Sequence, residues 1–311
     1  MADVVISEFM HEPTARALVA EFDAHWDPEL WRKREELLRH VADARAIVVR
    51  NATQVDQELL DAAPRLKLVA RMGVGLDNID VEACRARGVE VCPAVGANAV
   101  SVAEYVIATA MILLRGPAYF ATPHVLAGGW DRPRFGGGRE LEGRVMGIVG
   151  FGSIGQVVGR KARGMGMEVI AHDAALPEDA PAWQGARRVD LDTLIAEADV
   201  VTLHCPRLPE TIDLIDAARL ARMKPGAILV NSARGGIVNE PALAAALRSG
   251  QLGGAALDTL DVEPIDEATR ELFQGIDNLI LTPHIAGVTQ ESNRRIAEVA
   301  AANVRRVLAA G

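Results

Sequence analysis

Arg234, Glu263 and His284 each follow a short apolar segment of the kind that forms a buried strand. An imidazole can take or give a proton near neutral pH. A carboxylate beside the ring fixes its orientation and stabilises its charged form. A guanidinium presents a planar, permanently charged fork to a carboxylate or a polarised carbonyl oxygen. This combination predicts chemistry at a hydroxy acid, in which His284 takes the hydroxyl proton, Glu263 supports His284, and Arg234 holds the acid while a hydride leaves.

A glycine-rich segment earlier in the chain predicts where the hydride acceptor binds. The apolar run VMGIV leads into GFGSIG, the pattern G-x-G-x-x-G at the junction of a strand and a helix. Gly150 allows the tight turn, Gly152 lets a pyrophosphate approach the backbone, and Gly155 lets the helix pack close to the strand. N–H groups at the start of that helix, at Ser153 and Ile154, favour phosphate. Arg234, Glu263 and His284 could each be ordinary loop residues if taken alone, but their joint occurrence after this loop favours the functional interpretation.

Asp173 predicts which dinucleotide binds. It ends the segment AHD after a second apolar run, 18 residues beyond Gly155, about where an acidic ribose-binding residue is expected. Its carboxylate would accept hydrogen bonds from the ribose hydroxyls and repel a 2′-phosphate, which favours NAD over NADP. The alternative is a tight turn with a surface aspartate.

The elements that must position these residues form two series of alternating strands and helices. One begins near residue 3 and the other near residue 144, which predicts an α/β protein with two open parallel-sheet lobes. We expect the active site between the lobes, at the carboxyl ends of the strands. Further expectations are helices over Pro28–Val41, Ser101–Leu114 and Gln290–Leu308, a helix after Asn239 that Gly250 closes, and a loop over Gly128–Gly143.

Composition excludes several classes of protein. The chain has 311 residues, 50% of them hydrophobic, and a net charge of −9. The length fits two packed domains or one large α/β domain, and the negative charge argues against a nucleic-acid partner. The longest apolar run, Tyr105–Leu114, is too short to cross a bilayer, and no secretory signal is apparent. Cys84, Cys92 and Cys205 lie outside any metal-ligand spacing, so we expect free thiols in the cytoplasm and no metal.

Several segments together resemble the D-isomer-specific 2-hydroxyacid dehydrogenases, in particular the phosphoglycerate dehydrogenase-like branch. The matching stretches are VVRNAT, ARMGVGLDNID, NAVSVAEYVIA, GIVGFGSIG, LHCPRLPET, NSARGGIVNE, ALDTLDVEP and LTPHIAG. The resemblance implies a Rossmann-type NAD-binding domain, residues 96–285, inserted in a flavodoxin-like substrate-binding domain, residues 1–95 and 286–311. It also implies a homodimer whose interface includes the helix after Asn98.

The resemblance also implies roles for individual residues. Asp258 would contact the nicotinamide carboxamide, and Cys205 and Pro206 would line the adenine side. The expected cofactor contacts are Gly150, Gly152, Ser153, Ile154, Gly155, Asp173, Cys205, Pro206, Thr211, Ala233, Arg234, Asp258, His284 and Gly287. The expected substrate contacts are Arg50, Asn51, Val74, Gly75, Asn98, Arg234 and His284, with backbone groups of Val74 and Gly75 at the substrate carboxylate.

Arg50 bears on the choice of substrate. If it faces the cleft, the substrate carries a second anionic group, as 3-phosphoglycerate, sulfolactate and malate-like acids do; if the pocket is smaller, glyoxylate or hydroxypyruvate fits. Arg50 could instead be a solvated arginine at a strand end. The expected activity is therefore reversible hydride transfer between NAD(H) and a small 2-hydroxy or 2-oxo acid. A non-catalytic NAD(H)-sensing protein of the same fold is the alternative, because such relatives can keep the same three residues.

Overall fold

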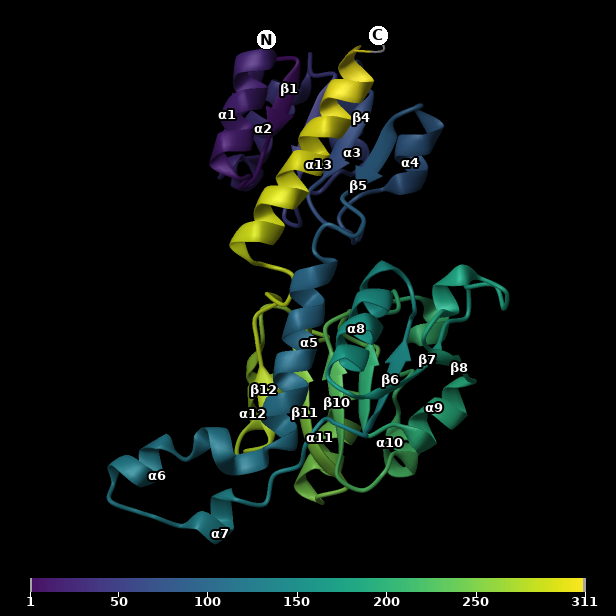
Figure 1. The fold of residues 1–311 in the computed structure, drawn as a ribbon. Coiled ribbons are helices and arrows are strands. Elements are labelled where there is room, and N and C mark those ends of the chain that lie inside the picture. Colours follow the sequence, from purple (N-terminus) through teal and green to yellow (C-terminus); the bar gives the residue numbers. More distant parts are fainter. Residues whose placement is uncertain (1, 310–311) are drawn as a thin grey trace. The chain divides into compact units, whose positions relative to one another are not determined.

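Residues 2–309 are described in a computed structural model, in which the chain forms two compact units (Figure 1). Unit 1 comprises the residues up to Asn98 together with those from Val288 onward, and unit 2 comprises Ala99–Gly287. The chain therefore leaves unit 1, completes unit 2 and returns. Among the described residues, no helix is both long enough and apolar enough to cross a membrane.

Unit 1 is built on one parallel sheet of five strands in the order β2-β1-β3-β4-β5. The strands are β1 (Val4–Ile6), β2 (Ala24–Trp26), β3 (Ala46–Val49), β4 (Leu68–Arg71) and β5 (Glu90–Pro93). The order 2-1-3-4-5 is that of flavodoxin-like sheets, and the prediction for this lobe is confirmed.

Helices cover both faces of the unit 1 sheet. Alternate residues of β1 separate the two cores: Val4 and Ile6 pack with one helix layer and Val5 with the other, as the two-residue period of a strand requires. The first layer holds α1 (Glu12–Glu21) and α13 (Gln290–Ala309), which lie side by side (Figure 1). The second holds α2 (Arg34–Val41), α3 (Gln57–Ala62) and α4 (Val81–Ala86).

Unit 2 has a parallel sheet of seven strands in the order β12-β11-β10-β9-β6-β7-β8. The strands are β6 (Val145–Val149), β7 (Glu168–His172), β8 (Arg187–Arg188), β9 (Val200–Leu203), β10 (Ala227–Asn231), β11 (Leu252–Leu257) and β12 (Leu279–Leu281). Counted from β6, the order reads 3-2-1-4-5-6 with a seventh strand added, which is the Rossmann arrangement. The predicted Rossmann-type lobe is confirmed.

Two helix layers also cover the unit 2 sheet. One holds α5 (Ala99–Leu114) and α8 (Ser153–Gly164). The other holds α9 (Leu191–Glu197), α10 (Ala217–Arg222), α11 (Glu240–Arg248) and α12 (Glu267–Phe273). The amide oxygen of Asn239 caps α11, and Gly250 takes a positive φ of 75° after the helix, as predicted. Short 3-10 turns cover Pro181–Trp183 and Pro209–Thr211.

Two local predictions are wrong. A single helix over Pro28–Val41 is replaced by a 3-10 turn (Leu30–Arg32) and α2, because Lys33 between them adopts φ −113° and ψ 69°. The predicted loop over Gly128–Gly143 contains a helical turn, α7 (Arg132–Phe135), which Asp131 caps by accepting a hydrogen bond from Arg134 N. With a 3-10 turn (Gly116–Phe120) and α6 (Thr122–Leu126), α7 forms an arm that extends away from the unit 2 sheet (Figure 1).

Candidate functional site

His284 and Glu263 form a hydrogen-bonded pair in unit 2. His284 Nδ1 lies 2.9 Å from Glu263 Oε2. A carboxylate can only accept, so Nδ1–H donates and Nε2 is the nitrogen left to exchange protons with a ligand. The other carboxylate oxygen, Oε1, accepts from Leu260 N at 2.9 Å. Both oxygens are thus held, and the imidazole keeps about half of its side-chain surface exposed. The geometry suits a proton-transfer pair.

The backbone at His284 is held in an unusual conformation. Its φ is +56°, in the left-handed region that residues other than glycine rarely enter. His284 N donates to the carbonyl oxygens of Asp258 and Thr282, at 2.9 and 3.0 Å. Strain of this kind persists only where neighbouring groups enforce it, and it concentrates at functional sites.

The side chain of Asp258 holds the backbone around His284 in this conformation. It is buried at the end of β11, and its Oδ1 accepts from Ile285 N and from the Thr282 hydroxyl, at 2.8 and 2.6 Å. Its Oδ2 accepts from Ala286 N at 2.8 Å. Both oxygens therefore fasten the segment that carries His284. The sequence indicated Asp258 as a cofactor contact, whereas this anchoring of residues 284–286 was not foreseen.

The Asp258 network continues into α5. The Thr282 hydroxyl donates to Asp258, so the phenol of Tyr105 donates to Thr282 Oγ1, 2.7 Å away. Burial raises the pKa of Tyr105 to about 12, which keeps this phenol a donor at neutral pH. A chain of hydrogen bonds thus joins α5 to the backbone beside His284.

Arg234 lies in the loop after β10, two residues before the positive-φ Gly236. Asn231 shapes this loop: its amide nitrogen donates to the Arg234 carbonyl oxygen at 2.8 Å, and its amide oxygen accepts from Ala233 N at 3.1 Å. The guanidinium itself is half-buried, and its Nη1 donates to the Ala233 carbonyl oxygen at 2.7 Å.

The glycine loop lies where the strand order of unit 2 reverses, between β6 and β9. This is the switch point at which doubly wound sheets bind ligands. A Cβ on Gly150 would come within 2.6 Å of the His204 carbonyl carbon, and one on Gly155 within 2.3 Å of the Gly150 carbonyl oxygen. Glycine is required at both positions because backbone occupies the space of a side chain.

Gly152 differs from these two glycines and marks the open side of the loop. A Cβ there would meet no atom within 4 Å beyond its chain neighbours, among the residues described. Gly152 is the N-cap of α8, and no side chain in the described chain caps this helix. Open space, uncapped N–H groups and the helix dipole together fit a pyrophosphate. Ser153 and Ile154 begin that helix, as predicted.

Asp173 follows β7, beside the same loop. Its Oδ2 accepts from Phe151 N at 2.7 Å, inside the G-x-G pattern, and its Oδ1 accepts from Ala175 N and Leu176 N, both at 2.9 Å. A carboxylate offers about four lone-pair sites, so these three bonds leave little capacity for ribose. Asp173 thus also fixes the shape of the phosphate loop.

The segment after β9 holds the predicted adenine-side residues. Burial raises the pKa of Cys205 to about 11, so its thiol stays protonated. The Thr211 hydroxyl donates to the Pro206 carbonyl oxygen at 2.8 Å and accepts from Leu208 N at 2.7 Å, which closes this loop. The hydroxyls of Ser232 and Thr259, at the ends of β10 and β11, are buried without a hydrogen-bond partner among the described residues. Such groups often mark a ligand or water site.

The predicted substrate contacts Arg50 and Asn51 lie in unit 1, directly after β3. The Arg50 Nη2 donates to Asn293 Oδ1 of α13 at 3.2 Å, and the guanidinium lies 5.8 Å from the centre of the Phe9 ring. Burial lowers the pKa of Arg50, although a guanidinium stays charged at any physiological pH. Arg50 is therefore a partly buried cation with defined contacts, and the alternative of a freely solvated arginine is not supported.

Val74 and Gly75 lie in the loop after β4, which the buried Arg71 holds. The Arg71 Nε donates to the Gly75 carbonyl oxygen at 2.9 Å, and its Nη1 donates to that of Met72 at 2.5 Å. Asn98 ends the first stretch of unit 1, and its Oδ1 is buried without a donor among the described residues. The sequence did not predict these hydrogen bonds of Arg71, because they depend on how the chain turns after β4.

Comparison with known proteins decides the family. A family model described as D-isomer specific 2-hydroxyacid dehydrogenase, NAD binding domain, matches residues 107–286. The chain is 50% identical over 309 residues to the (S)-sulfolactate dehydrogenase of Chromohalobacter salexigens, and the match covers 99% of both proteins. This chain belongs to the D-isomer specific 2-hydroxyacid dehydrogenase family.

Two further relatives extend this 2-hydroxyacid dehydrogenase assignment. The D-3-phosphoglycerate dehydrogenase of Archaeoglobus fulgidus is 41% identical over 271 residues, which cover 87% of this chain and 51% of that protein. The crystal structure of D-lactate dehydrogenase from Aquifex aeolicus, complexed with NAD and lactic acid, superposes with a TM-score of 0.83. It is 27% identical, and the superposition covers 99% of this chain and 96% of that one.

These findings settle the class of reaction and the cofactor. The 2-hydroxyacid dehydrogenase acts on a CH–OH group with NAD as acceptor, and unit 2 contains its NAD-binding domain. The predictions of family, enzyme class and cofactor are confirmed, and they favour an enzyme over a non-catalytic NAD(H)-sensing protein.

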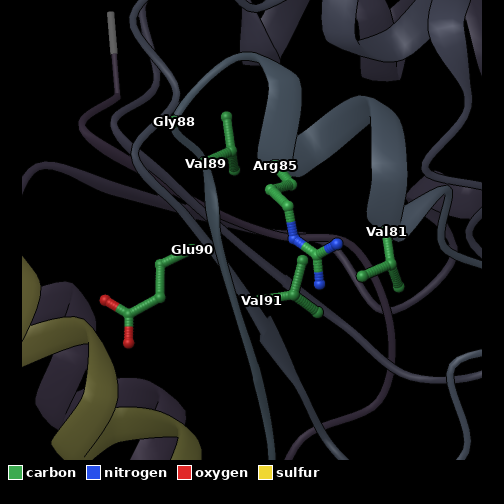
Figure 2. A pocket seen from close by; sticks show the side chains of 6 residues that line it. All are labelled: Val81, Arg85, Gly88, Val89, Glu90 and Val91. Atoms are coloured by element: carbon green, nitrogen blue, oxygen red, sulfur yellow. The ribbon is translucent and has the colours of Figure 1, made fainter.

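A separate hollow of the dehydrogenase lies in unit 1 between α4 and β5 (Figure 2). It is lined by Val81, Arg85, Gly88, Val89, Glu90 and Val91. Glu90 points towards α13, where Arg306 donates to it at 2.6 Å, and Arg85 donates to Glu82 at 2.9 Å. The charged groups here are paired with neighbours, and no predicted site residue lines this hollow, so the functional site lies elsewhere.

Proposed function

We propose that this enzyme oxidises (S)-sulfolactate to the corresponding 2-oxo acid, with the sulfonate bound through Arg50. The observation that carries the proposal is the partly buried Arg50 guanidinium, held by Asn293 and Phe9. A cation fixed in this way suits a substrate with a second anionic group. The similarity to a sulfolactate dehydrogenase over the full length of both chains supports a sulfonate.

His284 and Glu263 act as the proton-transfer pair of this reaction. Nδ1–H donates to Glu263, so Nε2 takes the proton of the substrate hydroxyl, and Glu263 stabilises the imidazolium that forms. Arg234 binds the substrate carboxylate and the developing carbonyl oxygen. NAD, when bound, accepts the hydride. Asp258 keeps His284 in place through the backbone of residues 284–286.

NAD is held by unit 2. The N–H groups of α8, at Ser153 and Ile154, bind the pyrophosphate beside Gly152, and the remaining lone pair of Asp173 meets the ribose. Gly150 and Gly155 keep the turn tight. The other contacts proposed for the cofactor are Cys205, Pro206, Thr211, Ala233, Asp258 and Gly287.

Unit 1 supplies the remaining substrate contacts. Backbone groups of Val74 and Gly75 meet the substrate carboxylate, in a loop that Arg71 fixes. Arg50, Asn51 and Asn98 reach the rest of the substrate.

The enzyme forms a homodimer through the arm and α5. Several apolar side chains are exposed there: Val100, Met111, Tyr119, Phe120, Leu126 and Trp130. Leu126 is 83% exposed and Trp130 79%, and such clusters of large apolar side chains mark protein interfaces. Light scattering of the protein and of Leu126→Asp tests this, with a dimer expected for the first and a monomer for the second.

A cytoplasmic location fits the three cysteines. Cys84 and Cys92 are buried, Cys205 is half-buried, and all three are free thiols. Fractionation of cells that express the tagged protein tests this, and recovery from another compartment would contradict it.

A panel of acids tests the proposed substrate. Oxidation of (S)-sulfolactate, 3-phosphoglycerate, malate and glycerate is followed by NADH formation, and reduction of glyoxylate and hydroxypyruvate by NADH loss. The highest kcat/KM is expected for sulfolactate, and Arg50→Ala is expected to raise the KM for sulfolactate but not for glyoxylate. An equal rise in the KM values for sulfolactate and glyoxylate would contradict the role of Arg50. A higher kcat/KM for another acid would mean that this acid, and not sulfolactate, is the substrate.

A further inference from the structure

Glu8 is a buried acidic residue that the reaction does not use directly. It follows β1 and is only 4% exposed. Its carboxylate accepts four hydrogen bonds, all from consecutive backbone N–H groups after β3. Oε1 accepts from Arg50 at 2.7 Å and from Thr53 at 3.0 Å. Oε2 accepts from Asn51 at 3.2 Å and from Ala52 at 3.0 Å.

This arrangement is an anion-binding loop filled by the protein's own carboxylate. Successive backbone N–H groups that converge on one point form a concave site for an anion. Hydrogen bonds to a carboxylate are among the strongest in proteins, and a buried carboxylate needs them to offset its loss of hydration. The conformation of residues 50–53 therefore depends on the charge and on both oxygens of Glu8.

The carbonyl side of the same loop is also held. Asn78 Nδ2 donates to the carbonyl oxygen of Thr53 at 2.7 Å and to that of Arg50 at 3.3 Å. The Ser7 hydroxyl lies 2.8 Å from Thr53 Oγ1, a contact between side chains that leaves the backbone groups of the loop to Glu8 and Asn78. Buried side chains thus fix both the N–H and the C=O groups of the loop.

The Glu8 segment also reaches the guanidinium of Arg50. The ring of Phe9, next in sequence, lies 5.8 Å from the guanidinium, whose Nη2 bonds to Asn293. The position of the Arg50 cation is therefore set by three contacts: its own backbone on Glu8, the face of Phe9, and Asn293.

We propose that Glu8 is a positioning residue for substrate specificity: its carboxylate holds the Arg50–Thr53 loop so that Arg50 meets the second anionic group of the substrate. This inference rests on the proposed function of Arg50. It assigns the selectivity for dianionic acids to a residue that touches neither the reacting atoms nor NAD.

A purely structural role predicts different kinetics. Loss of stability alone lowers the amount of active enzyme, so every substrate loses kcat to the same extent. A displaced Arg50 instead raises the KM for acids with a distal anion. The KM for glyoxylate, which has no distal group, and the Kd for NADH, which unit 2 binds, stay unchanged.

The test compares Glu8→Gln with Ser7→Ala. The amide keeps the size of the side chain. Its NH2 group cannot accept hydrogen bonds, however, so two of the four backbone N–H groups lose their acceptor. Glu8→Gln is expected to raise the KM for sulfolactate about tenfold, with the KM for glyoxylate changed less than about twofold. Ser7→Ala removes a buried neighbour of the same loop without touching the Glu8 bonds, and is expected to leave the ratio of the two KM values unchanged.

Two further variants keep the test decisive. If Glu8→Gln does not fold, as judged by thermal unfolding, Glu8→Asp is used, and the KM ratio is expected to rise about threefold because the shorter side chain keeps the charge but loosens the contacts. Glu8→Ala is assayed with and without formate, an anion small enough to replace the lost carboxylate, and formate is expected to lower the KM for sulfolactate.

The outcomes separate this inference from the proposed function. If the wild-type enzyme prefers acids without a distal anion, the proposed substrate is wrong. If the wild-type enzyme prefers sulfolactate and no Glu8 variant changes the KM ratio, the substrate stands and the role of Glu8 is overturned.

Discussion

Glu263 Oε2 lies 2.9 Å from His284 Nδ1, although the two residues are 21 positions apart in the chain. The contact is made because β11 and β12 are parallel neighbours, so the segments that follow them leave the sheet at the same edge. The second oxygen of Glu263 is bound to Leu260 N, which prevents the carboxylate from turning away. The pair is therefore preorganised before any ligand binds.

Glu263→Gln tests the importance of this contact. If the amide oxygen keeps the bond to Leu260 N, the amide nitrogen faces His284 Nδ1 and forces the proton onto Nε2, the wrong tautomer for a base. We expect kcat to fall by about 10²- to 10⁴-fold. Steady-state assays measure this, and Glu267→Gln, an exposed carboxylate in the first turn of α12, serves as the control. A kcat within threefold of wild type would contradict the role.

Substitution by alanine should have different effects at two glycines of the phosphate loop, on NADH binding at Gly152 and on stability at Gly155. Gly152→Ala adds a methyl group in open space at a φ of −75°, so the protein should fold normally but bind NADH about tenfold more weakly, because the methyl occupies the phosphate position. Gly155→Ala places a methyl group 2.3 Å from the Gly150 carbonyl oxygen, and should lower the free energy of unfolding by about 2 kcal/mol.

Calorimetric titration with NADH and urea unfolding measure the two effects. Gly164→Ala, at the end of the same helix in open space, should leave both unchanged. Normal NADH affinity in Gly152→Ala would show that the pyrophosphate lies elsewhere.

Asp258→Asn should weaken the hydrogen bonds that hold the segment around His284 against the rest of unit 2. The amide has one accepting oxygen where the carboxylate has two, so one of Thr282, Ile285 and Ala286 loses its acceptor. We expect a loss of about 2 kcal/mol in the free energy of unfolding and a lower kcat, since His284 is held through this segment. Asp277→Asn, on the exposed surface of unit 2, is the control for removal of a charge.

Asp199 gives a prediction for pH. Burial alone would raise the pKa of this carboxyl, but hydrogen bonds from Val145 N and Lys224 and the charge of Arg144 lower it below its usual value of 3.8. A carboxyl with a lowered pKa in the folded state contributes stability at pH values above 3.8, and this stability is lost as pH falls below that value.

Asp199→Asn should therefore be less stable than wild type at pH 7, by about 2 kcal/mol. The difference should shrink as the pH falls below 3.8, because the unfolded state gains its proton first and the folded carboxyl, whose pKa is lower, follows. Urea unfolding at pH 7 and at a series of pH values below 3.8 measures the difference. A gap that stays constant over this whole range would mean that the carboxylate charge is not what stabilises this site.

The sequence predicts those parts of the enzyme that depend on local patterns. The run from Val145 to Gly155 predicts strand, turn and helix together, because backbone contacts leave room only for glycine at Gly150 and Gly155. Asn239 and Gly250 predict the ends of α11, because capping depends on neighbouring residues. The alternation of strands and helices predicts the two parallel sheets, whereas their flavodoxin-like and Rossmann-type character is implied by the resemblance to the family.

Contacts between distant residues could not be predicted in this way. Glu8 binds N–H groups more than 40 positions away, and nothing near it in sequence marks it. Asp258 is singled out by resemblance as a cofactor contact, yet its bonds to residues 285 and 286 depend on where β12 ends. The three-residue strand β2 and the break at Lys33 likewise depend on tertiary contacts more than on propensity.

The most direct test is the oxidation of (S)-sulfolactate by His284→Gln, with kcat/KM and the Kd for NADH measured on the same preparation. The account predicts a kcat/KM at least about 10³-fold below wild type, since the proton acceptor is lost. The variant should still bind NADH, because the glycine loop and α8 hold the pyrophosphate, and its melting temperature should be unchanged. A kcat/KM within tenfold of wild type in a folded, NADH-binding variant would contradict the assignment of His284 as the acid–base residue.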